Sequence, residues 1–72
     1  MSPRDGDLVI VRSSDSEYRF EVEIVPGRPQ VRYRTRDEAL RQACQMARHG
    51  AIDVWYREGA ALSLVERFRV DD

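Results

Sequence analysis

The spacing of hydrophobic and polar residues changes once along the chain. From 7 to 34, and again from 52 to 70, apolar residues recur mostly at every second position or in short β-branched runs, which is typical of strands. Between 36 and 49 they recur every three or four residues, as in an amphipathic helix. The pattern predicts one helix at 36–49 and strands at 7–12, 18–24, 30–34, 52–57 and 61–70, the second half of the last leaving the sheet.

The predicted helix carries its own start and stop signals. Thr35 followed three residues later by Glu38 forms a capping box, in which each side chain bonds a backbone N–H of the other residue. Gly50 is expected to end the helix in the left-handed conformation. The apolar face is small, so the helix can lie close against a flat sheet. Its alanines are Ala39, Ala43 and Ala47.

The element order β-β-β-α-β-β predicts an α+β fold, an antiparallel sheet of four to five strands with one helix packed on one face. With 72 residues the chain is expected to form a single domain over 1–72, with 1–6 and 71–72 as flexible ends. A core of this size gives only a few kcal/mol of net stability, roughly 3–5. Because this net stability is small, a homodimer that buries additional surface is favoured.

Charge and composition argue against several classes of protein, among them disulfide-stabilised and membrane-spanning ones. The formal net charge is −1, so the chain as a whole does not attract nucleic acid or anionic membranes. All 12 basic residues are arginine, which we interpret as the habit of a GC-rich bacterial genome, the alternative being selection for bidentate contacts. The single cysteine excludes an internal disulfide, and no apolar run is long enough to span a bilayer. The sequence predicts a cytoplasmic bacterial protein that binds no membrane.

Residues for catalysis are scarce. His49 and Cys44 are the only residues of their types, and no serine lies at a strand-to-helix elbow. His49 is expected to be solvated at the helix end, and Cys44 to be a small buried hydrophobe, with a reactive thiol or an intermolecular disulfide as the alternatives. The prediction is a protein that is not an enzyme, with no cofactor, no metal and no small-molecule substrate.

The sheet face away from the helix is the candidate functional surface. Alternation places the Trp55 indole on it without fixing its exposure, and three interpretations stay open. Arginines form cross-strand salt bridges with Glu21 and Glu23, or Trp55 is the centre of a protein contact, or the indole stacks on an unpaired nucleic-acid base. The candidate residues are Trp55, Arg19, Arg32, Arg34, Arg57, Val65 and Arg67.

Residues 35–68 read TRDEALRQACQMARHGAIDVWYREGAALSLVERF. This segment resembles a family of short bacterial domains of unknown function, which have a strand pair, a capped T-x-x-E-A helix, an I-x-V strand, a charged turn with glycine and a final strand. Where that family has a glycine and a tryptophan in its second strand, this chain has Glu17 and Tyr18. The resemblance implies the fold and a bacterial origin, and it transfers no activity or site residue.

The sequence therefore predicts a non-enzymatic protein interaction module of unknown partner. It is expected to associate with itself or with another protein, through the uncovered sheet face or through an edge strand. The alternative is a small nucleic-acid-binding domain that uses Trp55 and the surrounding arginines.

Overall fold

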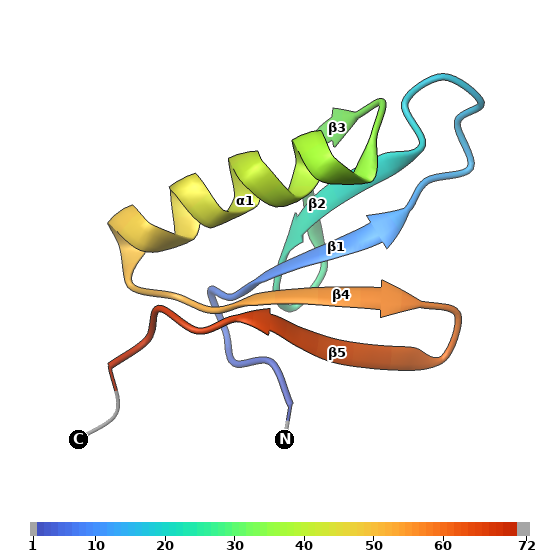
Figure 1. The fold of residues 1–72 in the computed structure, drawn as a ribbon. Coiled ribbons are helices and arrows are strands. Elements are labelled where there is room, and N and C mark those ends of the chain that lie inside the picture. The colour runs from blue at the N-terminus through green and yellow to red at the C-terminus, as the bar shows by residue number, and fades with distance from the viewer. Residues whose placement is uncertain (1, 71–72) are drawn as a thin grey trace.

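The computed structural model describes residues 2–70, and at residue 30 the backbone alone. One helix packs on one face of a five-stranded sheet, which confirms the predicted α+β class (Figure 1). The expected flexible end at 71–72 lies outside the described residues, as does residue 1. The elements are β1 (Leu8–Arg12), β2 (Phe20–Ile24), β3 (Arg28–Tyr33), α1 (Arg36–Gly50), β4 (Val54–Glu58) and β5 (Ala61–Glu66).

The strand order is β3-β2-β1-β4-β5. The neighbours β1 and β2, β2 and β3, and β4 and β5 are antiparallel, as expected for hairpins. The central pair, β1 and β4, is parallel, with Leu8 opposite Val54 and Ile10 opposite Tyr56. The sequence predicts an antiparallel sheet, and this pair is the one exception among the described strands. Its cause is the helical crossover after β3, which returns the chain along the sheet in the direction that it had before the helix.

The two ends of α1 follow the predicted signals with one change. The Thr35 hydroxyl oxygen accepts a hydrogen bond from the Glu38 backbone N–H at 3.1 Å, so the expected N-cap is present. At the other end the residue in the left-handed conformation is Ala51, with φ 53°, and Gly50 is the last helical residue. The prediction of Gly50 as the left-handed residue is therefore wrong by one position. Within residues 2–70, no helix is long and apolar enough to cross a membrane.

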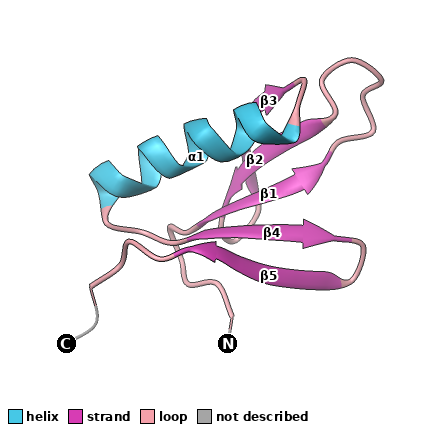
Figure 2. Cartoon of the chain, viewed as in Figure 1, coloured by secondary structure: helices cyan, strands magenta, loops and turns pink. Residues whose placement is uncertain are grey.

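The main core lies between α1 and the sheet. The helix contributes the three predicted alanines, all fully buried, and their small side chains let α1 lie close to β1, β2, β3 and β4. The sheet contributes larger apolar side chains to the same layer, namely Leu8, Ile10, Phe20, Val22 and Val54. Val31 of β3 lies opposite the buried Val22 but is itself 44% exposed, because β3 is an edge strand. Figure 2 shows β5 at the margin of the sheet, away from the helix.

Candidate interaction surface: the β5 edge and its anchor

In the structure, the candidate surface residues lie near both edges of the sheet, some near β3 and others near β5. Because β3 and β5 are the first and last of five strands, they lie about 19 Å apart at the usual ~4.8 Å between neighbouring strands. The candidate residues therefore do not form one surface. On or beside β3 are Arg32, Arg34 and, in the loop before β2, Arg19. On or beside β5 are Arg57, Val65 and Arg67.

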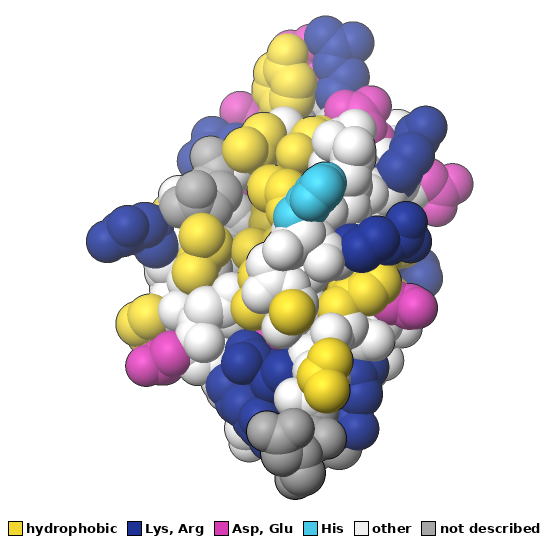
Figure 3. Space-filling view, turned by 90° about the vertical axis from the view of Figure 1, so that its left-hand side faces the viewer, with side chains coloured by type: hydrophobic (Ala, Val, Ile, Leu, Met, Phe, Trp, Pro, Cys, Tyr) yellow, Lys and Arg dark blue, Asp and Glu magenta, His cyan; other side chains and the backbone are white. Residues whose placement is uncertain are grey.

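Arginines near β3 form ion pairs. Arg32 Nε lies 3.2 Å from a carboxylate oxygen of Glu21, directly opposite it in the β2–β3 register. Arg34 Nη2 lies 2.8 Å from a carboxylate oxygen of Glu17. The cross-strand salt bridge predicted for this face is thus confirmed for Arg32 and Glu21. On the face shown in Figure 3, arginine side chains lie at the top and at both sides, and others gather near the lower end.

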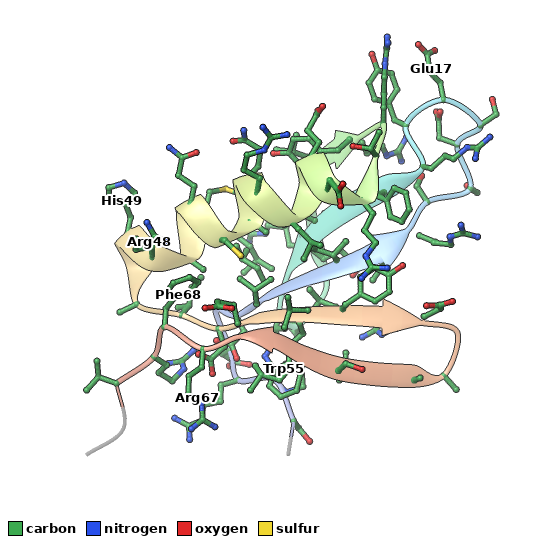
Figure 4. The ribbon with its side chains drawn as sticks, in the orientation of Figure 1. Glu17, Arg48, His49, Trp55, Arg67 and Phe68 are labelled. Carbon is green, nitrogen blue, oxygen red and sulfur yellow. The ribbon has the colours of Figure 1, made fainter. Side chains whose placement is uncertain are left out.

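Trp55 lies on the predicted face but not at an open surface. Its side chain is 3% exposed, and its indole N–H donates a hydrogen bond to Asp7 Oδ2 at 3.1 Å. In the sheet it lies between Val9 of β1, also buried, and Leu64 of β5. Figure 4 shows Trp55 below β4 and β5, on the side away from α1. Its burial argues against two of the three open interpretations, in which the indole is the centre of a protein contact or stacks on a base.

Asp7 is the centre of a buried polar network beneath the sheet. Its side chain is 1% exposed, and its carboxylate accepts hydrogen bonds from the Arg4 backbone N–H at 3.0 Å and the Asp53 backbone N–H at 3.1 Å. It also accepts from the Trp55 indole and the Arg69 guanidinium. Within the segment expected to be flexible, Arg4 and Gly6 are thus tied to the fold, since the Gly6 N–H donates to the Val25 carbonyl oxygen.

Two opposing effects set the pKa of Asp7. Burial by itself raises it, because a carboxylate loses its hydration. The donors, led by the Arg4 backbone N–H and Arg69, stabilise the ionised form more strongly, so the pKa lies below the ordinary value of 3.8. The carboxylate is therefore negatively charged at neutral pH and is the counter-ion of Arg69.

A second carboxylate fastens the chain after β5. Asp53 Oδ1 accepts hydrogen bonds from the backbone N–H groups of Phe68 and Arg69, both at 3.0 Å. The Arg48 guanidinium lies over the Phe68 ring at 5.6 Å from its centroid, and Figure 4 shows the two side chains together near the end of α1. These contacts direct residues 67–70 away from the direction of β5. They explain why β5 ends at Glu66 rather than at Val70.

Stability should decrease in acid through Asp7. Because the folded-state pKa is lowered, the ionised carboxylate contributes stability that is fully present above the unfolded-state pKa, about 3.9, and is lost as the pH falls through the folded-state value. Urea denaturation from pH 7 to pH 2 should show a falling unfolding free energy, with a smaller fall for Asp7→Asn. The matched control is Asp5→Asn, an exposed carboxylate nearby, which should keep the wild-type dependence.

The two sheet edges differ in chemistry. β3 carries Pro29 and the arginines Arg28 and Arg32, which are residue types that keep other strands from pairing. The β5 residues from Ala61 to Val65 are uncharged, and none is a proline. All of β5 is exposed or half-exposed, with Leu62 at 36% and Val65 at 38%. Gly59, at φ 60°, makes the turn that brings β5 back along β4.

Sequence reasoning missed two parts of this site. It placed Asp53 and Arg69 on the face away from the helix but did not predict that they form a buried network with Asp7, since no local pattern distinguishes an acidic residue at a strand end that will be buried. Because it placed Val65 on the face away from the helix, alternation along the strand also assigned Leu62 and Leu64 to the helix side. In the structure they lie opposite Arg57 and Trp55, and paired residues share a face, so both leucines lie on the face away from α1.

A pocket of about 340 Å³ lies on α1, lined by Arg41, Cys44, Gln45 and Arg48. Burial raises the pKa of the Cys44 thiol above its usual 9.0, and the negative charge of Glu66 raises it further, against the opposite effect of Arg48. A thiol with a raised pKa stays protonated at neutral pH and is a poor nucleophile. Cys44 packs against the core as the small hydrophobe that the sequence predicts.

Comparisons of the chain with protein-family models, curated proteins and solved structures find no match. The resemblance of residues 35–68 to short bacterial domains of unknown function thus stays a prediction.

Proposed function

We propose that the domain is a non-enzymatic protein interaction module that binds by adding a strand to β5. The observation that carries this proposal is an exposed edge strand, uncharged from Ala61 to Val65, held in place by an anchored hairpin. An edge strand presents a row of backbone N–H and C=O groups, and an extended segment of another chain satisfies them by pairing. Backbone bonds then supply the affinity.

The contrast between the edges supports this assignment. Soluble proteins usually protect edge strands with charges, prolines or bulges, and β3 has all three, its register shifting between Val22 and Glu23 of β2. β5 has a register shift opposite Val54 and Trp55 near its end, which leaves Ala61 to Leu64 in regular pairing with β4. The side chains along that stretch are small or apolar. Such a segment on an open edge is typical of a surface that pairs with another strand.

The hydrogen bonds of Asp7 and Asp53 to the segment after β5, which we call the anchor, explain why the outer edge of β5 stays open to another strand. Asp7 and Asp53 hold the segment after Glu66 beside the start of β4, so it does not fold back along β5. Trp55 fixes the other side of the hairpin by packing beside Leu64. A pre-formed edge pays less ordering entropy on binding than a mobile one would.

The proposal includes a bacterial, cytoplasmic setting, supported by the single cysteine and the arginine-only basic residues. Nucleic acid binding has less support than protein binding. The indole that would stack on a base is buried, and Arg32 and Arg34 are paired with carboxylates. No cofactor is needed for strand addition.

The proposal predicts selective binding of an extended peptide. A short alternating threonine–valine peptide is titrated into the isotope-labelled domain, and backbone amide signals are followed by NMR. The amide signals of β5 should shift with saturable behaviour, and those of β3 should not. Leu62→Pro is the blocking variant, because Leu62 and Arg57 are a pair without mutual hydrogen bonds, so the Leu62 N–H points to the open edge. Proline removes that donor, and Val31→Pro on β3 is the matched control. Shifts at β3 alone, or at neither edge, would contradict the proposal.

A further inference from the structure

We infer that the strand added to β5 is β5 of a second copy, paired antiparallel about a two-fold axis at Ser63. This inference rests on the proposed function and names its partner. The result is one continuous sheet running through both copies, with β5 and its symmetry mate at the centre. Two-fold dimers are the commonest closed assembly, and their interface must be complementary to itself.

The register follows from the charges next to the strand. An axis at Leu62 sets Glu58 of one copy opposite Glu66 of the other, and like charges opposite each other destabilise a strand pair. An axis at Leu64 sets Glu66 opposite Leu62, which leaves a carboxylate against an apolar side chain. An axis at Ser63 avoids both, since Glu66 then lies opposite Ala60 of the second copy.

The same register pairs the exposed Leu62 with the half-buried Leu64. With Ser63 on the axis, Leu62 of each copy lies opposite Leu64 of the other, on the sheet face away from α1. Within each copy Leu64 is already beside the buried Trp55. The dimer therefore extends an existing apolar layer across the interface and covers Leu62, which is 36% exposed in a single copy.

The size of the contact sets the strength expected. A pairing limited to Ala61–Glu66 and its flanking side chains falls in the class of small interfaces, below about 1,200 Å² in total, where association is weak and transient. The inference is thus a dimer that forms with rising concentration and dissociates on dilution.

Ser63 allows a charge-swap test. It is exposed, and substitutions at exposed positions away from special features usually change stability by less than about 0.5 kcal/mol. Ser63→Lys places two ammonium groups opposite each other at the axis, and Ser63→Asp places two carboxylates there. Each variant alone should dimerise at least tenfold more weakly than wild type in sedimentation equilibrium at low salt. An equimolar mixture of the two should regain dimer, because the axis then joins opposite charges.

Val31→Lys, at an exposed position on β3, is the matched control and should leave the dimer unchanged. Circular dichroism checks that every variant is folded, and wild type is measured from micromolar to millimolar concentration. A wild-type monomer throughout, variants that dimerise like wild type, or a mixture no better than its components would each overturn the inference. If the wild type is monomeric but the threonine–valine peptide still shifts the β5 amides, only the choice of partner fails. If the peptide shifts nothing either, the proposed function fails as well.

Discussion

Asp7→Ala is expected to lower the unfolding free energy by about 3–5 kcal/mol, the usual effect of removing one partner from a buried ion pair. The substitution removes the ion pair between Asp7 and Arg69, and it removes the carboxylate that accepts hydrogen bonds from the Asp53 and Arg4 backbone N–H groups and the Trp55 indole. A single domain of 72 residues has a net stability of only a few kcal/mol, roughly 3–5. The variant should therefore be close to unfolding at room temperature.

Urea denaturation followed by Trp55 fluorescence measures this loss. Asp7→Asn keeps one acceptor oxygen and should fall between wild type and Asp7→Ala. Asp5→Ala, at an exposed carboxylate nearby, is the control and should change stability by less than about 0.5 kcal/mol. Equal stability of Asp7→Ala and wild type would show that the network beneath the sheet does not hold the fold together.

Trp55→Ala is expected to have an effect of similar size, about 3–5 kcal/mol, which is typical of truncating a buried aromatic side chain. The indole is 3% exposed and lies between Val9 and Leu64, so its removal opens a cavity beneath the sheet. It also removes one donor from the Asp7 carboxylate. Thermal unfolding followed by circular dichroism should show the loss.

Trp55→Phe separates the two contributions. It keeps much of the ring but not the N–H group, so it should cost about 1–3 kcal/mol, the range for leaving a buried polar group without one partner. An exposed, contact-forming Trp55 would behave differently, since Trp55→Ala would then leave stability nearly unchanged. That result would restore the indole as a binding residue and contradict its role as part of the fold.

Local signals predicted the helix well and the strand ends less well. The Thr35 cap and the three alanines of α1 lie where the pattern indicates, since capping and helical periodicity depend on near neighbours. β2 begins at Phe20 rather than Tyr18. The Asp15 carboxylate accepts hydrogen bonds from the Glu17 and Tyr18 N–H groups, both at 2.8 Å, and these two residues belong to the loop before β2 rather than to the strand.

Contacts between strands distant in sequence determine which face Leu62 and Leu64 share and which strands pair, and local sequence patterns do not contain this information. Alternation correctly grouped Leu62 with Leu64, but which face they share depends on the partner strand, and pairing with Trp55 set it. The parallel contact of β1 with β4 likewise joins segments separated by the whole helix. The same contact brings Asp7 beside Asp53, so the anchor of β5 appears only once the central strands are paired.

The most direct measurement of the central claim is amide hydrogen exchange of the two edge strands as the protein concentration is raised. If a second copy pairs with β5, the β5 amides that are not bonded to β4 should exchange more slowly at high protein concentration. The outward amides of β3 should exchange as quickly as in dilute solution. Unchanged exchange along β5, or protection that appears at β3 instead, would contradict a second copy pairing at β5.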